Sequence, residues 1–419
     1  MATCLTSDFS ALHIRIEALP ENHPLTHVPL FDLAPHGQQL LAWNGTGHQL
    51  LGWGNALSIT VDGPHAIRDA ARIWDEVRSV AHVDSPTQAP RAPFAFGSFG
   101  FASTTPGILR VPEVTIIDHD YQRFIATAAL SAPAPDPLAS AEAAAQEKEK
   151  NPIHIPSGLR TQPGRMTQNA WAESVRRVIE RLRLGSASKV VMARDMRVTS
   201  PLPVDERFLL QRLSKLYPTT WVYAVDKLIG ATPELLASTR DGTVHSRVLA
   251  GSARTHADRL MTDMKERTEH LLAVESVVRA LSPLVDSLDV PSEPFLLELP
   301  NVTHLATDIH GHLRDSNVLD VVSAVHPTAA VCGSPTPLAF DLLSTYETTE
   351  RGRYCGPIGW IDAQGEGEFG IALRCAQLSK DGTNLRLFAG AGIMPDSVPE
   401  AELAETRAKM SPLLEALGI

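Results

Sequence analysis

The sequence is short of positive charge: 37 Lys and Arg residues stand against 48 Asp and Glu residues, giving a net charge of −11 at pH 7. Binding to a polyanion requires an excess or a strong local cluster of cations. We therefore expect no nucleic-acid partner. The composition, 43% apolar and 20% charged residues, is that of a compact globular protein and excludes a disordered or fibrous chain.

Long apolar runs are also missing. Apolar stretches such as 208–210 and 329–332 are far shorter than the roughly 20 residues that cross a bilayer. Residues 1–20 contain no basic region followed by an apolar segment, which is the pattern of an export signal. These observations predict a protein without a membrane span or a membrane partner, located in the cytoplasm.

Cysteine is scarce. The chain contains four, namely Cys4, Cys332, Cys355 and Cys375. Because they form no C-x-x-C pair, neither a disulfide framework nor a zinc ribbon is predicted. We expect them to be small buried side chains.

Two short patterns look like ligand-binding motifs but lie in the wrong context. Residues 365–370 read G-x-G-x-x-G, yet residues 371–378 alternate between apolar and polar, which favours a hairpin over the strand-to-helix turn that binds a dinucleotide. His304, His310 and His312 are conceivable metal ligands. Their alternation along the chain favours a simpler interpretation, the polar face of a strand.

The chain divides into three regions by composition. Residues 1–130 alternate short apolar runs with Pro, Gly and Asn, which predicts antiparallel strands with one helix at 66–80. Residues 131–165 are rich in Ala and Pro and poor in large apolar residues, so they form a linker or an excursion from the fold. Patterns with chemical meaning become frequent in residues 166–419.

After residue 185, strand-like blocks outnumber helices. Strands are predicted at 221–225, 242–251, 301–313, 356–364, 369–378 and 385–394. Helices are predicted at 257–284, 318–325, 336–349 and 399–417, the last capped by Asp396 or Ser397. Few helical crossovers among many strands favour an α/β (α+β) fold of antiparallel sheets with helices outside, rather than a doubly wound parallel sheet.

Two of these helices carry glutamates three residues apart. Positions i and i+3 are neighbours on one helical face, so the two carboxylates of each pair point the same way. The pairs are Glu266 with Glu269 and Glu402 with Glu405. Brought together, they could bind Mg2+, a hard cation that takes oxygen ligands. Taken alone, either pair is more often a solvated face or a favourable first-turn charge.

Two charged residues interrupt apolar segments. Lys189 begins KVVMARDMRV, where loss of solvation could turn its amine into a base. The simpler interpretation is a solvated strand end. Glu234 follows Pro233 in GATPELLAS, where burial could raise its pKa and make it a proton donor. The simpler interpretation there is a carboxylate at a helix start.

Taken together, the segments in residues 166–417 resemble the chorismate-utilising enzymes, the family of isochorismate, salicylate, anthranilate and aminodeoxychorismate synthases. FGSFGF at 96 also resembles the glycine-aromatic turn of that family. The motifs that carry the resemblance are KVVMAR at 189, ATPELLAS at 231, LAGSAR at 249, KERTEH at 265, LPNVTHL at 299, HPTAAVCGSP at 326, ERGRYCGPIGW at 350, GEGEFGIALRCAQL at 365, AGAGIM at 389 and EAELAETRAKM at 400.

The resemblance implies a single large domain over residues 1–419, in which two antiparallel sheets pack as a core with helices outside and the site lies in a cleft between the sheets. It also implies chorismate as the substrate, Mg2+ as the cofactor and a monomeric protein. Chorismate is a dicarboxylate, which accounts for a cation and arginine anchors in an otherwise acidic protein.

The resemblance further implies roles for individual residues. Lys189 is expected to activate water for attack on C2 of chorismate, and Glu234 is expected to protonate the departing C4 hydroxyl. The expected magnesium ligands are Glu269 and Glu405 directly, and Glu266 and Glu402 through water. The expected substrate-binding residues are Gly251, Ser252, His326, Tyr354, Arg374, Gly390, Gly392 and Lys409.

Within that last set, the implied contacts differ. Arg374 and Tyr354 match the pair that holds the enolpyruvyl carboxylate, and the glycines match backbone positions where a side chain would block the approach of a carboxylate. Lys409 is expected to pair with the acidic cluster. His326 is expected to line the C4 side of the pocket.

Water is the nucleophile that fits best within the family. Aminodeoxychorismate synthases have a nucleophilic lysine where this chain has Ala250, and anthranilate-type enzymes read FPAGT-SGAPK where it has HPT at 326 and CGSPTP at 332. We therefore expect no glutaminase partner. Salicylate synthases usually show a GTR-like turn, whereas Gly251 is followed here by Ser-Ala-Arg. These differences favour isochorismate synthase. A salicylate synthase and a non-catalytic chorismate-binding protein remain alternatives.

Overall fold

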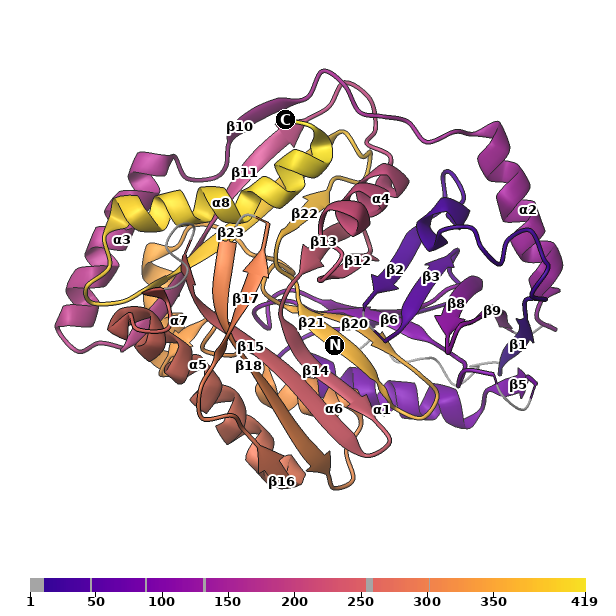
Figure 1. The fold of residues 1–419 in the computed structure, drawn as a ribbon, viewed down its shortest axis with the longest axis horizontal. Coiled ribbons are helices and arrows are strands. Elements are labelled where there is room, and N and C mark those ends of the chain that lie inside the picture. Colours follow the sequence, from indigo (N-terminus) through magenta and orange to yellow (C-terminus); the bar gives the residue numbers. More distant parts are fainter. Residues whose placement is uncertain (1–10, 46, 87–88, 131–132, 254–258, 301) are drawn as a thin grey trace.

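The computed structural model describes residues 11–419 except 46, 87–88, 131–132, 254–258 and 301. Two large sheets form the body of the molecule, and the helices lie around them (Figure 1). Most strand pairs are antiparallel, whereas β1 (Leu12–Ala18) and β5 (His82–Asp84) pair in parallel. The predicted class, antiparallel sheets with helices outside, is confirmed.

Both sheets combine strands from the two ends of the chain. The 13-stranded sheet runs β10 (Arg160–Pro163), β11 (Lys189–Thr199), β23 (Asn384–Ile393), β22 (Cys375–Leu378), β13 (Leu228–Thr232), β12 (Trp221–Val225), β2 (Leu40–Asn44), β3 (Gln49–Trp53), β8 (Val114–His119), β9 (Gln122–Leu130), β1 and β5, with β19 (Gly333–Ser334) beside β11. The 10-stranded sheet runs β16 (Val285–Asp289), β18 (Val302–Leu313), β15 (Thr243–Ala253), β14 (Leu235–Arg240), β21 (Gly367–Ile371), β20 (Pro357–Ile361), β6 (Ala95–Ser98), β7 (Gly107–Val111) and β4 (Leu57–Val61), with β17 (Phe295–Leu299) beside β18. Since neither sheet can be divided at one point of the sequence, we propose that the chain forms a single domain.

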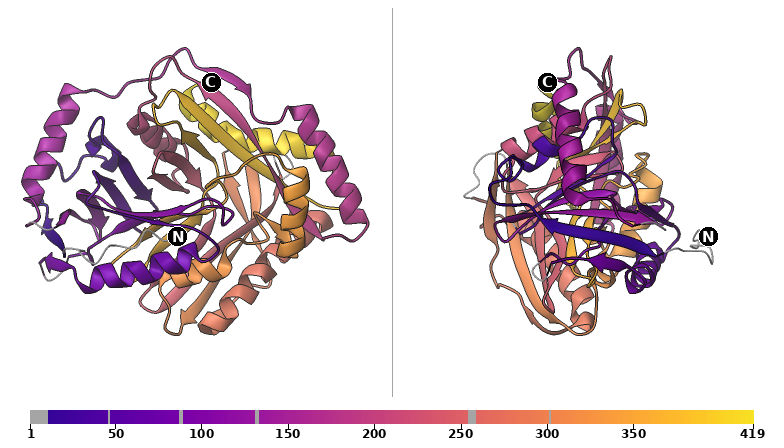
Figure 2. Two further views of the ribbon diagram at one scale, coloured as in Figure 1. Left: turned by 180° about the vertical axis from the view of Figure 1, so that it is seen from behind. Right: turned by 90° about the vertical axis from the view of Figure 1, so that its right-hand side faces the viewer.

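The helices cover the outer faces and the ends of the sheets. They are α1 (Ala66–Ser79), α2 (Pro137–Lys150), α3 (Gln168–Arg183), α4 (Glu206–Leu216), α5 (Met264–Leu281), α6 (Val318–Val325), α7 (Thr336–Tyr346) and α8 (Pro399–Leu417), with short 3-10 helices at Leu30–Leu33 and Ser282–Leu284. Helix α8 packs on β23 and α5 packs on β15. Figures 1 and 2 show α2 and α3 at opposite ends of the molecule. None of the helices in the described residues is both long and apolar enough to cross a membrane.

The segment 131–165 is more ordered than a linker. Its described part forms α2, which packs against β9 and β1, and β10, which extends the larger sheet beside β11. We therefore propose that this segment is an excursion from the fold rather than a linker. The buried residues of α2 are Pro137, Ala141 and Ala144, so the helix packs with few large apolar side chains and its sequence looked like a spacer.

Two helix starts differ from the sequence prediction. Helix α5 begins at Met264 because the carboxylate of Asp263 accepts hydrogen bonds from the backbone N–H groups of Lys265 and Glu266. Residues 257–258 of the longer predicted helix lie outside the described residues. Helix α8 is not capped by Asp396 or Ser397. Pro399 occupies its first turn and Val398 precedes it, so no side chain caps this end.

The predicted cysteine environment is confirmed where it can be seen. Cys332, Cys355 and Cys375 are all buried. Cys4 lies outside the described residues. The predicted strand over 369–378 is interrupted, because β21 ends at Ile371 and β22 begins only at Cys375. The interruption contains Arg374, whose φ of 48° lies in the left-handed region.

Candidate active site

One pocket takes its walls from both sheets and from two helices. β11 and β23 of the larger sheet form one side, where Val191 is paired with Gly392. β15 and the chain before β14 form the other side, and α5 and α8 contribute one glutamate each. The lining residues are Val191, Pro233, Glu234, Leu249, Ala250, Gly251, Ser252, Glu269, His304, Ala330, Val331, Tyr354, Cys355, Leu373, Arg374, Gly390, Gly392, Glu405 and Lys409.

Most of the residues predicted from the sequence converge on this pocket. Those that line it are Glu234, Gly251, Ser252, Glu269, Tyr354, Arg374, Gly390, Gly392, Glu405 and Lys409. Lys189, Glu266 and Glu402 do not line it but contact residues of the same cluster, as described below. His326 lies elsewhere.

Glu234 is the acid of the pocket with the strongest pKa perturbation. It follows β13 and immediately precedes β14, so the end of one strand and the start of the next hold its backbone. Only 4% of the residue is exposed. Burial raises the pKa of Glu234 to about 8, although a backbone hydrogen bond from Leu249 opposes the shift. The carboxyl group is therefore largely protonated at neutral pH and can donate a proton.

Lys189 is fully buried at the start of β11. Its Nζ atom lies 3.0 Å from Oε1 of Glu269 on α5. No further hydrogen bond to the described residues accompanies this ion pair. Lys189 is therefore not a solvated strand end, because its amine is buried beside a glutamate that lines the pocket.

The predicted glutamate pairs come together through Ser252. Its backbone N–H donates to Oε2 of Glu266 at 2.8 Å, and its hydroxyl donates to Oε1 of Glu405 at 2.9 Å. Gly251 makes this possible because its φ of 76° turns the chain at a bulge in β15. Glu405 also pairs with Lys409 at 2.5 Å, which confirms the predicted contact of that lysine with the acidic cluster.

The cluster has the donor chemistry of a magnesium site. Four carboxylates from α5 and α8 supply hard oxygen atoms, which Mg2+ prefers to nitrogen or sulfur. In the described part of the chain, however, no group of three or more His, Cys, Asp or Glu side chains is already arranged as a ligand set. The oxygens instead contact lysines and hydroxyls, and the hydroxyl of Ser397 donates to Glu402 at 2.7 Å. The residues fit Mg2+ by type, and binding requires some of these contacts to be exchanged.

Arg374 is held by a residue whose role the sequence did not indicate. Its Nη2 atom lies 2.8 Å from Nε2 of His304, which is buried in β18. Burial and the nearby Arg374 lower the pKa of His304 well below its usual value, so the neutral ring accepts a hydrogen bond from the guanidinium. Tyr354 lies in the same pocket with its ring stacked on Phe388. The signal for His304 was its place on a polar strand face, but its partner is 70 residues away.

His326 is not among the residues that line this pocket. This residue ends α6, and its Nε2 atom lies 3.2 Å from the backbone oxygen of Phe101. Its ring lies in a different pocket, beside Phe101 and Phe340. The helix end directs the side chain toward the turn after β6 rather than toward Glu234, which a motif alone could not show.

The structure also shows the surroundings of the two other sequence patterns, the glycines of 365–370 and the histidines of β18. Gly365 lies in the turn between β20 and β21, which form a hairpin, so the predicted hairpin is confirmed. His310 is exposed and stacks on His245 at 4.5 Å, far from the buried His304 along β18. His304 and His310 therefore have separate partners, and no group of three metal-binding side chains is found among the described residues.

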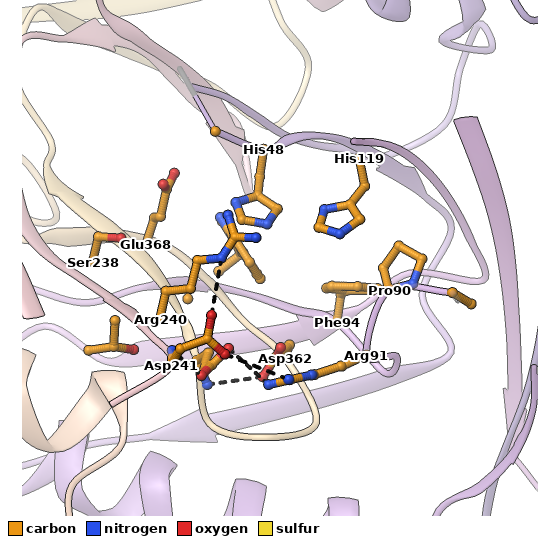
Figure 3. Close-up of a pocket in the computed structure, with 16 residues that line it drawn as sticks. His48, Pro90, Arg91, Phe94, His119, Ser238, Arg240, Asp241, Asp362 and Glu368 are labelled. Carbon is orange, nitrogen blue, oxygen red and sulfur yellow. Dashed lines mark hydrogen bonds and ion pairs between the residues drawn. The ribbon is translucent and has the colours of Figure 1, made fainter. Parts of the chain in front are cut away.

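Figure 3 shows a second pocket that contains none of the predicted site residues. Its rings include His48 and His119, stacked 5.4 Å apart. At its rim, Arg91 lies 3.2 Å from Glu366 and 3.8 Å from Asp241. The buried acids of this pocket also have partners, because Asp362 accepts hydrogen bonds from backbone N–H groups and Glu368 accepts one from Trp43. The first pocket instead combines a buried acid with Arg374 and the glutamate cluster. We place the candidate active site in the first pocket.

Gly392 leaves room that the glutamate cluster requires. A Cβ atom at this position would lie 2.0 Å from Oε1 of Glu269 and 3.1 Å from Cε of Lys189. We predict that Gly392→Ala lowers kcat/KM by about 100-fold, because displacement by 1 Å at a reacting centre has effects of this size. Steady-state kinetics would measure it. Gly47→Ala, where the nearest atom would be 3.7 Å away, is the control; equal activity of both variants would contradict the prediction.

A fold of two antiparallel sheets with this pocket between them is that of the chorismate-utilising enzymes. The family model described as chorismate binding enzyme matches residues 11–418. The chain therefore belongs to this family.

The named relatives narrow the comparison. The isochorismate synthase DhbC of Bacillus subtilis is 35% identical over 271 residues, which are 59% of this chain and 68% of the relative. The salicylate biosynthesis isochorismate synthase of Pseudomonas aeruginosa is 29% identical over 410 residues, 90% of this chain and 84% of the relative. The solved structure of MenF, the menaquinone-specific isochorismate synthase of Escherichia coli, superposes with a TM-score of 0.78 at 23% identity, covering 98% of this chain and 96% of that one. At that identity the last comparison supports the fold alone.

Proposed function

We propose that this protein is an isochorismate synthase, an isomerase that interconverts chorismate and isochorismate. The observation that carries the proposal is the convergence in one pocket of a protonated acid, Glu234, with Arg374 and with Glu269 and Glu405. Arg374 would bind one carboxylate of the substrate, and a cation held by Glu269 and Glu405 would bind the other. Glu234 would supply the proton for the departing hydroxyl. The names of the relatives in Bacillus subtilis and Pseudomonas aeruginosa support the same activity.

The substrate would be held at both of its carboxylates. Arg374, positioned by His304, and Tyr354 would bind the enolpyruvyl carboxylate. When bound, Mg2+ would neutralise the ring carboxylate and fix its position. Glu269 and Glu405 would be its direct ligands, with Glu266 and Glu402 acting through water.

The proton transfers would fall to Lys189 and Glu234. Lys189 would take a proton from the water whose oxygen forms the new bond to C2. The ring double bonds shift as the C4–oxygen bond breaks, and Glu234 would protonate the leaving hydroxyl, which departs as water. Addition and loss of water balance, so no redox cofactor is needed and the reaction can run in both directions.

Ala250 supports water as the nucleophile. It lines the pocket from β15, at the position where the sequence comparison within the family places a nucleophilic lysine. A methyl group offers no amine to attack C2. We therefore propose that the protein does not form aminodeoxychorismate and has no glutaminase partner. As the family resemblance implies, we also propose that it is a monomer.

A salicylate synthase is the second candidate. It would form isochorismate in the same way and then expel pyruvate. The observation that favours it is the name of the Pseudomonas aeruginosa relative, an isochorismate synthase of salicylate biosynthesis that spans 90% of this chain. Relatives named for siderophore and menaquinone pathways are also similar, so we propose that the product serves one of these routes.

The pH dependence of kcat should reveal Glu234. Its folded pKa of about 8 lies above the ordinary value of 4.5, so the proton-donating form is present below pH 8 and is lost as the pH rises through that value. We predict that kcat falls above about pH 8. Rates measured from pH 6 to 10, with thermal melting at each pH to confirm folding, would test this. A kcat that stays constant to pH 10 would contradict the assigned acid.

A metal titration tests the proposed function as a whole. Purified protein is freed of metal with EDTA, incubated with chorismate, and then given MgCl2, and isochorismate is measured by chromatography. Conversion should appear only after Mg2+ is added. Complete absence of turnover with Mg2+ would overturn the enzyme assignment and favour a non-catalytic chorismate-binding protein.

A further inference from the structure

Lys265 stands out in the glutamate cluster because no role follows for it from the mechanism above. Its Nζ atom lies 3.1 Å from Oε1 of Glu402 and 3.4 Å from Oε1 of Glu266. It thus joins α5 to α8 at two of the four oxygen-bearing side chains. Cationic residues are disfavoured in the first turn of a helix, where the macrodipole is positive, yet Lys265 is the second residue of α5.

The surroundings explain what keeps this ammonium in place. The side chain of Glu402 is only 3% exposed, and an unpaired buried carboxylate is costly. Burial lowers the pKa of Lys265, but Glu402 and Glu266 outweigh it and hold that pKa above its ordinary value. The lysine side chain is itself 25% exposed, so it has a path to solvent that Glu402 lacks.

We propose that Lys265 is an internal counter-ion that competes with Mg2+ for Glu266 and Glu402. This inference rests on the proposed function, which makes the glutamates the magnesium site. A divalent cation that binds these oxygens, directly or through water, is repelled by the ammonium of Lys265, which already pairs with Glu266 and Glu402. Its binding therefore requires the ammonium of Lys265 to swing toward solvent.

The competition has a consequence for the order of binding. An ammonium that must be displaced weakens Mg2+ binding, while the ring carboxylate of a bound substrate adds negative charge and offsets that loss. Binding of Mg2+ and binding of the substrate should therefore favour each other, since such coupling is reciprocal. Lys189 and Lys409 pair with the other two glutamates, but Lys265 is the one of these three with two carboxylate partners in its ion pairs.

Calorimetric titration of the full-length protein with MgCl2 alone tests the proposal. Wild type and Lys265→Met are stripped with EDTA, dialysed at one ionic strength and titrated without substrate. The variant should bind Mg2+ at least about fivefold more tightly, the lower end of common couplings between linked sites. Its melting temperature without Mg2+ should be lower than that of wild type, and the increase on adding Mg2+ should be larger.

Two further variants separate competition from a general charge effect. Arg267→Met removes a positive charge two residues away on α5, at a pair with the exposed Glu293, and should leave the dissociation constant within about twofold of wild type. Lys265→Arg keeps the charge and should keep the weak affinity. If Lys265→Met folds poorly, Lys265→Gln replaces it and should show the same tighter binding of Mg2+.

The failures of the two proposals are distinguishable. If wild type binds Mg2+ and Lys265→Met and Lys265→Gln bind it equally or more weakly, Lys265 supports the ligands and the competition is wrong while the magnesium site stands. If wild type does not bind Mg2+ with or without chorismate, the proposed magnesium site itself is wrong, and the competition falls with it.

Discussion

Replacement of Lys189 by alanine is expected to lower kcat by about 100- to 10,000-fold, the range that a positioned general base contributes. Binding of chorismate with Mg2+ should persist, because Arg374, Tyr354 and the glutamates, which we propose hold the substrate and the metal, all remain. Stopped assays for isochorismate give kcat, and calorimetry with chorismate gives binding. Removal of Lys189 also leaves Glu269 without its ion-pair partner, so a loss of thermal stability is expected in the absence of Mg2+.

The variant Lys189→Arg separates the base from the counter-ion. Arginine stays protonated in proteins and cannot accept the proton of water, yet it can keep an ion pair with Glu269. It should therefore lose turnover as alanine does while recovering stability. Lys227→Ala, which removes a lysine paired with Glu206 outside the site, should keep full activity. High turnover in Lys189→Arg would show that the positive charge, not proton transfer, is what the reaction needs.

Replacement of Glu234 by glutamine is expected to lower kcat by about 100- to 10,000-fold, since the amide keeps the shape of the side chain but is a poor proton donor. The pocket should still bind chorismate. The control is Glu206→Gln, because Glu206 is also a glutamate whose pKa is raised by partial burial, and it lies at the start of α4 outside the pocket. Its loss should not change kcat. If Glu234→Gln and Lys189→Ala both keep full activity, the acid and base assignments are wrong.

Much of the fold follows from local patterns. Strand-like apolar blocks predicted β12 and β23, and a helix was predicted over 399–417, where α8 lies. The order of strands in the sheets does not follow, because pairs such as β13 with β22 join segments well over a hundred residues apart. The alanine-rich α2 was ambiguous since its buried face is made of small side chains.

For the site as well, the sequence predicted which residues belong to it but not all of their contacts with residues far away in the chain. Resemblance to a family grouped Glu234, Arg374 and four glutamates, and Glu234, Arg374, Glu269 and Glu405 line one pocket of the structure. It could not predict the contact of Arg374 with His304, which depends on how β18 lies beside the loop after β21. Nor could it predict the contact of His326 with the backbone of Phe101, because a sequence motif records the order of residues and not the direction of a helix end.

We expect isochorismate to be the final product of the reaction. The most direct measurement incubates the protein with Mg2+ and either chorismate or isochorismate, and resolves both compounds together with salicylate, anthranilate and pyruvate by chromatography. The account predicts that both starting compounds reach the same mixture of chorismate and isochorismate without stoichiometric pyruvate. Accumulation of salicylate and pyruvate in equal amounts would contradict it and assign the protein as a salicylate synthase.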